Sequence, residues 1–233
     1  MSKKDELRKQ RKNTVINNTS KWQEKDLENS IASVQKKLQK TFPGIKLHHQ
    51  SQMLLKEVIS DLENAFPEVD FKYYHKTSSM RPDGGILSVV SKNEQRKHPI
   101  LIAEKKNQGT NDLRTKEGKA KQAKGNAIER LGKNVIGFRT ALLPESIFPF
   151  VCFGDGCDFA DDSSIIDRVV TIAMFGHLNK EYVHALGGDR FNRGSFYFRE
   201  KVWTKEEMAR LCYSIAEKAV FYYFSKYGKE SFI

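Results

Sequence analysis

Two acidic residues and one lysine have the types and the spacing needed to cut a phosphodiester bond. Asp83 lies in the segment RPDGGILSVV, and Glu104 and Lys106 lie in the following apolar segment, PILIAEKKNQG. Side chains alternate between the faces of a strand, so Glu104 and Lys106 would share one face and Lys105 would take the other. If the two apolar segments pair as a hairpin, Asp83 comes close to Glu104.

Two carboxylates so close together repel each other unless a cation lies between them. Oxygen ligands favour Mg²⁺, which is held by a few carboxylates and keeps waters that a phosphate can displace. Such a metal would lower the pKa of a water, and Lys106 would orient that water or help to deprotonate it. The pattern is loose by itself, because a turn aspartate and an ion pair at a strand end would explain the same residues. A carboxylate inside ILIAEKK is costly to bury without a partner, which favours the site.

The charge of the chain favours a polyanionic partner. Its 233 residues include 40 Lys plus Arg and 29 Asp plus Glu, a formal net charge of +11. Nucleic acid or an acidic membrane surface would suit this excess, although a well-solvated basic surface has the same composition. No segment reaches the roughly 18 apolar residues of a membrane span, and the N-terminus lacks the apolar core of a signal peptide. We therefore expect a cytoplasmic protein. The cysteines, Cys152, Cys157 and Cys212, form no CxxC pair and are expected to be reduced and buried.

The apolar pattern predicts an α/β protein with a basic arm. Residues 1–20 are polar and basic and are expected to form a flexible arm, and residues 21–233 a single domain. Helical spacing predicts helices over residues 22–42, 51–66, from about 126, and 204–228, where Thr204 and Glu207 suggest a capping box. Strands are predicted over residues 45–49, 69–76, 86–90, 99–106, 148–154 and 168–175.

A basic stretch follows the acidic residues, as expected of a surface that contacts phosphates. Its members are Lys105, Lys106, Arg114, Lys116, Lys119, Lys121, Lys124, Arg130, Lys133 and Arg139. Within it, GNAIER at residues 125–130 falls at a predicted helix start. Asparagine can bind adenine through N6 and N7, and arginine offers a fork to purine acceptors. Alternatively, Asn126 and Glu129 are an N-cap and a capping-box-like partner.

Four segments together resemble the EcoRI family of type II restriction endonucleases, in the same order and at similar spacing. They are PDGGI at 82–86, LIAEKKNQG at 101–109, GNAIER at 125–130 with KN at 133–134, and ES-FPF-F at 145–153. The resemblance is clear over about residues 80–160, fainter from 35 to 80 and weak after 175. It implies a restriction-endonuclease-like fold with a mixed five-stranded sheet between helices. It also implies a homodimer that acts on palindromic double-stranded DNA with Mg²⁺, and a companion DNA methyltransferase.

The resemblance implies roles for individual residues. Asp83 and Glu104 match the metal-binding acids, and Lys106 matches the catalytic lysine. The segment that lies in the major groove is matched by Ala123, Lys124, Gly125, Asn126 and Ala127. Contacts with the adenines are implied for Asn126 and Arg130, with Glu129 supporting them across the dimer.

Two positions depart from the family pattern. Lys105 stands where a small residue is usual, and we expect it to face away from the site. Downstream, LNKEYVHAL keeps Asn179 and Lys180 as candidate DNA contacts but lacks a further arginine of the prototype. Recognition of the outermost base pair is therefore left open.

The expected function is hydrolysis of double-stranded DNA at a short palindrome containing AATT, of which GAATTC is one form, leaving 5′-phosphate ends in a bacterial cytoplasm. One alternative is another PD-(D/E)xK nuclease of the repair or junction type, against which GNAIER argues. A second is a DNA-binding protein that does not cleave, which has no need of an acid pair beside a lysine.

Overall fold

The computed structural model describes residues 15–107, 109–120, 125–160, 163–185 and 194–233. In these ranges, no helix has both the length and the apolar character needed to cross a membrane. Ala123 and Lys124, two of the candidate DNA contacts, lie outside the described residues, as do residues 1–14 of the expected arm.

One mixed sheet of five strands runs through the molecule in the order β1-β4-β5-β6-β7, which confirms the predicted α/β class and strand number. Its antiparallel part consists of β1 (Leu47–Gln50), β4 (Ile86–Val90) and β5 (Lys97–Asn107). Its parallel part continues from β5 through β6 (Phe150–Asp155) and β7 (Ser195–Arg199). A separate two-stranded ladder pairs β2 (Met53–Leu54) with β3 (Ser79–Met80).

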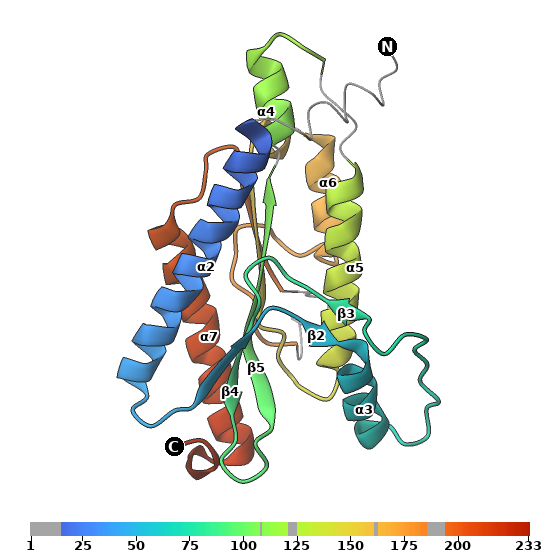
Figure 1. Ribbon diagram of the computed structural model, residues 1–233, viewed down its shortest axis with the longest axis vertical. Coiled ribbons are helices and arrows are strands. Elements are labelled where there is room, and N and C mark those ends of the chain that lie inside the picture. The colour runs from blue at the N-terminus through green and yellow to red at the C-terminus, as the bar shows by residue number, and fades with distance from the viewer. Residues whose placement is uncertain (1–14, 108, 121–124, 161–162, 186–193) are drawn as a thin grey trace.

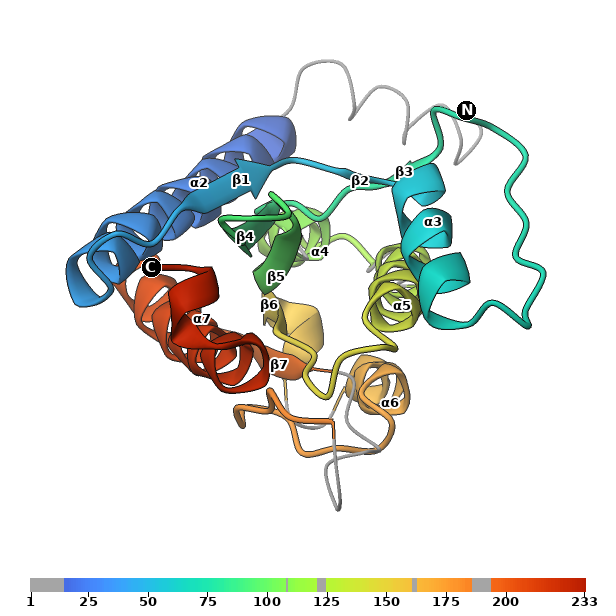
Figure 2. The ribbon, with the colours of Figure 1, turned by 90° about the horizontal axis from the view of Figure 1, so that it is seen from below.

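Helices cover both faces of this sheet. Figures 1 and 2 show α2 (Val15–Thr41) and α7 (Lys205–Tyr227) on one face. On the other face lie α3 (Leu55–Ala65), α5 (Gly125–Ala141) and α6 (Ser164–Ile172). The short helix α4 (Gly109–Lys116) follows β5, and two 3₁₀ turns, η1 (Cys157–Phe159) and η3 (Lys229–Ser231), complete the order.

The central strand β5 divides the core, because its side chains alternate between the two faces. Leu101 and Ala103 pack with residues of α2 and α7, whereas Ile102 packs with residues of α3, α5 and α6. Both faces are therefore covered, which explains why PILIA is apolar without interruption. The same alternation directs Glu104 and Lys106 toward the α5 side, and Lys105 toward the α7 side.

The starts of helices α7 and α2 can be compared with what the sequence predicted. Thr204 Oγ1 accepts a hydrogen bond from Glu207 N–H at 3.2 Å, and the Glu207 carboxylate accepts one from Thr204 N–H at 3.0 Å. The predicted capping box is therefore confirmed. Helix α2 ends at Thr41 but begins at Val15, so residues 15–20, assigned by composition to the arm, are helical.

Two predicted strands are wrong. Residues 69–76 form a loop in which Tyr74 is 90% exposed, because the alternating side chains have no sheet to pack against. Residues 168–175 fall in α6 and the turn after it. Ile165 and Val169, one helical turn apart, are its buried residues, and Ser163 accepts a hydrogen bond from Ile165 N–H at the N-terminus. The apolar residues of RVVTIAMF therefore reflect the burial of one face of a helix and not a strand.

Other boundaries differ from expectation as well. Helix α3 begins at Leu55, after the short strand β2, so Ser51 is not its cap. Strand β7, with the sequence SFYFR, and helix α4, inside the polar stretch after β5, were not predicted. Both are short, and α4 carries little apolar periodicity that could have indicated it.

Candidate active site

The turn before β4 places Asp83 at the edge of β5. Pairing between the strands begins with Ile86 and Ile102, so β5 continues beyond the end of β4. The ladder is prolonged by Gly84 N–H, which donates to Ala103 O at 2.9 Å. Two residues further along β5, Lys105 N–H donates to Asp83 Oδ2 at 3.1 Å. The carboxylate of Asp83 thus takes the place of the next strand acceptor, which fixes its position relative to β5.

The two glycines after Asp83 are needed for this close approach. A Cβ atom on Gly84 would lie 2.9 Å from the Cβ of Ala103 and 2.9 Å from a methyl carbon of Leu27. Gly85 has a φ of +74°, which other residues rarely adopt, and a Cβ there would lie 2.6 Å from His49 Nε2. The same His49 nitrogen hydrogen-bonds to Gly84 O at 2.9 Å.

The structure brings Asp83, Glu104 and Lys106 together. Lys106 Nζ lies 3.3 Å from Asp83 Oδ2 and also donates to Glu104 Oε1. The Glu104 side chain is 2% exposed, that of Lys106 12% and that of Asp83 30%. Two carboxylates and one ammonium leave a net negative charge that solvent reaches through Asp83.

Burial and neighbouring charges set the protonation of this group. Burial raises the pKa of Glu104, and the ammonium of Lys106 opposes that rise. For Lys106, burial works to lower the pKa, but the charges of Glu104 and Asp83 outweigh it, and the pKa lies above its usual range. Lys106 is therefore protonated at neutral pH. Burial also raises the pKa of the adjacent Cys152 thiol, which stays neutral.

Helix α5 adds a fourth residue, Asn134, to this group. Asn134 Nδ2 lies 3.3 Å from each carboxylate oxygen of Glu104. The sequence pattern gave Asn134 no role beyond its place in KN at 133–134, one of the family segments. Asn134 lies four residues after Arg130, which places both on the same side of the helix. This spacing could have indicated Asn134 as a further candidate residue.

The donor set of this site fits a hard divalent cation. Asp83 and Glu104 offer carboxylate oxygens, and Mg²⁺ in phosphate-processing sites is commonly held by one or two carboxylates with waters and substrate phosphates. Within the described ranges, no group of three His, Cys, Asp or Glu side chains forms a metal-binding cluster.

Lys105 forms a separate ion pair on the other face of β5. Its Nζ lies 2.6 Å from Asp155 Oδ2 at the end of β6, and the two side chains are 3% and 2% exposed. Asp155 also accepts a hydrogen bond from Trp203 N–H at 3.3 Å. Lys105 faces away from the acid pair, as expected.

The GNAIER segment opens α5. The helix begins at Gly125, so Asn126 lies in its first turn and not at the N-cap. The side chains of residues 125–127 lie outside the described ones, whereas those of Glu129 and Arg130 are described and exposed. Glu129 borders a hollow between α5 and α6 that Arg168 also lines. The DNA contacts expected of this segment stay predictions.

Asn179 and Lys180 are both exposed and lie before β7. Asn179 has a φ of +59°, and its Oδ1 accepts a hydrogen bond from Phe198 N–H at 2.9 Å. Its own N–H donates to Phe196 O at 2.8 Å. The oxygen of this side chain is thus used to cover the edge of β7, which leaves its amide nitrogen for other contacts.

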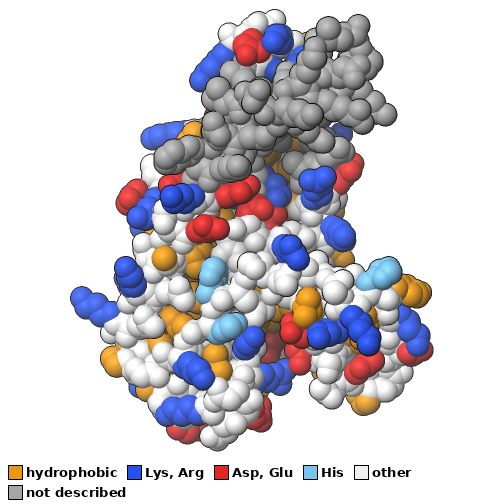
Figure 3. Space-filling model, in the orientation of Figure 1, with side chains coloured by type: hydrophobic (Ala, Val, Ile, Leu, Met, Phe, Trp, Pro, Cys, Tyr) orange, Lys and Arg blue, Asp and Glu red, His pale blue; other side chains and the backbone are white. Residues whose placement is uncertain are grey.

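Among the described residues, the members of the basic stretch do not form one continuous face. Lys105 and Lys106 are held in the ion pairs described above, and the guanidinium of Arg139 lies 5.7 Å from the ring centre of Phe148. Lys119 pairs with Glu117 at 2.8 Å. On the face shown in Figure 3, lysine and arginine side chains are spread over the surface, and acidic ones gather just below the grey part.

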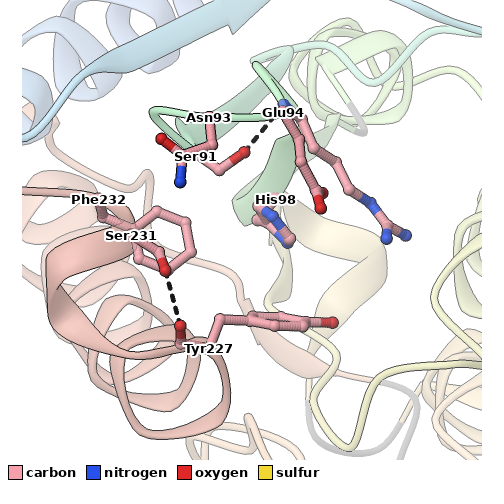
Figure 4. Close-up of a pocket in the computed structure, with 8 residues that line it drawn as sticks. Ser91, Asn93, Glu94, His98, Tyr227, Ser231 and Phe232 are labelled. Carbon is pink, nitrogen blue, oxygen red and sulfur yellow. Dashed lines mark hydrogen bonds between the residues drawn. The ribbon is translucent and has the colours of Figure 1, made fainter.

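A cavity of about 300 Å³ lies at the opposite end of the sheet, between the β4–β5 turn and the end of α7. Figure 4 shows His98 pointing into it between Tyr227 and Phe232. None of the candidate catalytic or DNA-binding residues lines this cavity.

Comparison with known proteins decides the family. The sequence model of the restriction endonuclease EcoRI matches residues 9–230. The chain belongs to the EcoRI family. The type II restriction enzyme RsrI of Cereibacter sphaeroides is 30% identical over 224 residues, which cover 81% of this chain and 80% of that enzyme. The type II restriction enzyme EcoRI of Escherichia coli is 29% identical over 143 residues, which cover 58% of this chain and 51% of that enzyme. This member of the EcoRI family is thus a type II restriction endonuclease, a hydrolase whose substrate is DNA.

Proposed function

We propose that this EcoRI-family enzyme hydrolyses double-stranded DNA with Mg²⁺ at a short palindrome containing AATT and leaves 5′-phosphate ends. The observation that carries the proposal is the convergence of Asp83, Glu104 and Lys106 at the C-terminal end of β5, where solvent reaches the group through Asp83. A repair or junction nuclease could share these three residues, but membership of a restriction family and the GNAIER segment favour site-specific cleavage.

Each residue of the group has a distinct task in this proposal. Asp83 and Glu104 would hold Mg²⁺, which lowers the pKa of a water and screens the phosphate charge when it is bound. The charges of Glu104 and Asp83 raise the pKa of Lys106, so without metal it is an ammonium that donates hydrogen bonds. Its ammonium would orient the attacking water or a phosphate oxygen and offset the charge that develops there.

A homodimer would match the symmetry of the substrate. Two identical chains related by a two-fold axis place the same surface on each half of a palindrome, so two Asp83–Glu104–Lys106 groups would cut opposite strands. Residues 123–127 would lie in the major groove, with Asn126 and Arg130 contacting adenines and Glu129 supporting them from the partner chain. Asn179 and Lys180 are the candidates for the outer base pair, whose identity we leave open.

Sequencing the ends of digested DNA tests this proposal. With Mg²⁺ the protein should convert DNA of known sequence into discrete fragments whose ends map to AATT sites, and EDTA should stop the reaction. Ligation before and after phosphatase treatment reports whether the ends carry 5′-phosphate. A smear of fragments would indicate a nuclease without site specificity, and binding without cleavage would indicate the non-cleaving alternative.

The proposed adenine contact can be tested at one residue. A bidentate base contact contributes about 1–3 kcal/mol of discrimination, so Asn126→Ala should lower cleavage at AATT sites about 10- to 100-fold. Thr140→Ala is a matched control, because Thr140 lies near the other end of α5, where its exposed hydroxyl donates to Ile136 O within the same helix. Equal activity of Asn126→Ala and the control would contradict the assignment.

Cleavage of unmodified cellular DNA would require protection of the host sites. The proposal therefore includes a cognate DNA methyltransferase that acts on the same sequence in the bacterial cytoplasm, where adenine is the base that it can methylate within AATT. DNA methylated within its AATT sites should resist the enzyme, while unmethylated DNA of the same sequence is cut. Cutting of both at the same rate would contradict this link.

A further inference from the structure

Helix α5 connects the predicted base-reading positions to the acid pair. Positions 126, 130 and 134 are four residues apart, so they form one row along the helix. The rise of 1.5 Å per residue makes this row about 12 Å long. One end of the row carries the proposed adenine contacts, and the other end carries Asn134, whose Nδ2 lies 3.3 Å from both oxygens of Glu104.

Asn134 is fixed to the helix body by its neighbours. Leu131 and Val135 are fully buried in the core between α5 and the sheet, so the helix cannot rotate without disturbing that packing. The amide therefore moves with α5. Glu104 in turn is 2% exposed, so its carboxylate has few hydrogen-bond partners available besides Lys106 and Asn134.

We propose that Asn134 is a positioning residue that makes the orientation of the Glu104 carboxylate depend on how α5 is seated on DNA. This inference rests on the proposed function. When α5 engages the correct bases, the amide nitrogen donates to both oxygens of Glu104 and holds the carboxylate in the direction required of a metal ligand. A wrong base pair that shifts α5, against the cost of disturbing the packing of Leu131 and Val135, would move the amide with the helix, and the carboxylate would lose that support.

A merely structural role for Asn134 makes different predictions. Loss of a structural contact would lower the unfolding temperature and reduce DNA binding and cleavage together. Loss of a positioning contact should spare DNA binding and weaken the steps that need Glu104. Removal of a side chain that orients a metal ligand typically lowers metal affinity or activity by about 10- to 100-fold.

The experiment compares Asn134→Ala with Asn134→Gln and with the helix control Thr140→Ala. Binding to a duplex containing the cognate site is measured without divalent metal, and Ca²⁺ affinity is measured by calorimetry on that protein–DNA complex. Single-turnover cleavage is measured at the cognate site and at a site with one changed base pair, over a range of Mg²⁺ concentrations.

We expect Asn134→Ala to bind DNA as the wild type does, to cleave the cognate site about 10- to 100-fold more slowly, and to need more Ca²⁺ and Mg²⁺ for saturation. The ratio of cognate to altered-site cleavage should also fall, because the link between α5 and Glu104 is lost. Asn134→Gln keeps the amide on a longer stem and should recover part of the rate.

Three outcomes would overturn the inference: cleavage and Ca²⁺ affinity of Asn134→Ala that match those of Thr140→Ala, a cleavage loss that a loss of DNA binding fully explains, or an unchanged ratio between the two sites. If the wild type itself fails to cleave, the proposed function is wrong. The Ca²⁺ titration still reports in that case whether Asn134 supports Glu104 as a cation ligand.

Discussion

Two neighbouring lysines of β5 form ion pairs on opposite faces of the same strand, and the two pairs differ in charge and access. Lys105 meets one carboxylate, that of Asp155, and both side chains are sealed from solvent at 3% and 2% exposure. Lys106 meets two carboxylates, those of Asp83 and Glu104, and Asp83 is 30% exposed. The buried pair with balanced charges can only stabilise the fold. The group with one carboxylate in excess is open to solvent, so it can bind a cation and then a phosphate.

Burial of charge alone therefore does not identify the reactive group. Both lysines lie in the interior, and a search for buried ionisable residues would find both. The count of opposite charges around each lysine and the path to solvent separate them. The following variants test whether this distinction holds, beginning with the one for which we expect the largest effect.

Asp83→Asn should abolish most cleavage and leave the fold intact. The substitution keeps an oxygen that can accept the hydrogen bond from Lys105 N–H, but it removes the negative surplus that a divalent cation needs. Because a bound metal contributes several kcal/mol to such a reaction, the rate should fall on the order of 1,000-fold or more. Single-turnover cleavage and thermal unfolding, measured on the same preparation, check both halves.

Asp70→Asn is the matched control for this variant. It makes the same chemical change in an exposed ion pair with Lys72, where little effect on activity or stability is expected. Normal cleavage by Asp83→Asn, or its failure to fold, would show that Asp83 does not belong to the chemistry.

Lys105→Ala should have the opposite profile. It removes the ammonium that pairs with the buried Asp155 carboxylate, which should cost about 3–5 kcal/mol of unfolding free energy. A double variant, Lys105→Met with Asp155→Asn, should recover most of this loss, because no unpaired charge stays buried and the introduced amide oxygen can still accept from Trp203 N–H. Urea unfolding curves measure the stability of each variant.

The cleavage rate of Lys105→Ala, measured well below its unfolding transition, decides how far the comparison extends. We expect it to fall far less than that of Asp83→Asn. A stable but inactive Lys105→Ala protein would place Lys105 with the catalytic group, and the contrast between the two faces of β5 would be lost.

His98 lies at the end of the sheet opposite to the acid pair. We expect this residue to govern the pH dependence of the unfolding free energy in the mildly acidic range. Burial, and then the charge of Arg96, lower its pKa from 6.5 to about 4. Between these values the unfolded chain binds the proton and the folded chain does not. The contribution of neutral His98 to the free energy of unfolding is therefore complete above about pH 6.5. It is lost as the pH falls toward 4, which lowers the unfolding free energy by about 3 kcal/mol.

His98→Phe should flatten this part of the stability curve, because a phenyl ring can pack with Tyr223 and Tyr227 and cannot take up a proton. Urea unfolding at several pH values measures it, with the exposed His177→Gln as control. An unchanged slope would show that groups nearer the active site, and not His98, govern the acid sensitivity of the fold.

Local patterns were sufficient to predict the elements that carry the chemistry. The turn and the apolar runs in RPDGGILSVV and PILIAEKK predicted two strands, and Asp83 was expected near Glu104 if these strands paired as a hairpin, which they do. The capping box at Thr204 and the apolar rows of α2 and α7 predicted those helices. In each case the signal lies within one segment, and burial on a single sheet or helix face enforces it.

Contacts between distant segments could not be predicted in this way. Asn134 meets Glu104, and Asp155 meets Lys105, only because α5 and β6 pack beside β5. Strand β7 depends on its neighbour β6 for its hydrogen bonds, and its few residues have no distinctive pattern of their own. The apolar segment at 168–175 could suit either a strand or a helix, and its tertiary neighbours selected the helix.

The turn at Gly84 and Gly85 makes the enzyme vulnerable at positions that carry no charge. Neither residue can accept a side chain without displacing β5, α2 or His49, and any such displacement moves Asp83. If the host needs protective methylation, as proposed above, only cells with an inactive enzyme would survive where that methylation is absent. Alleles selected in this way should often carry a larger residue at one of these two glycines, with every ionisable group of the active site unaltered.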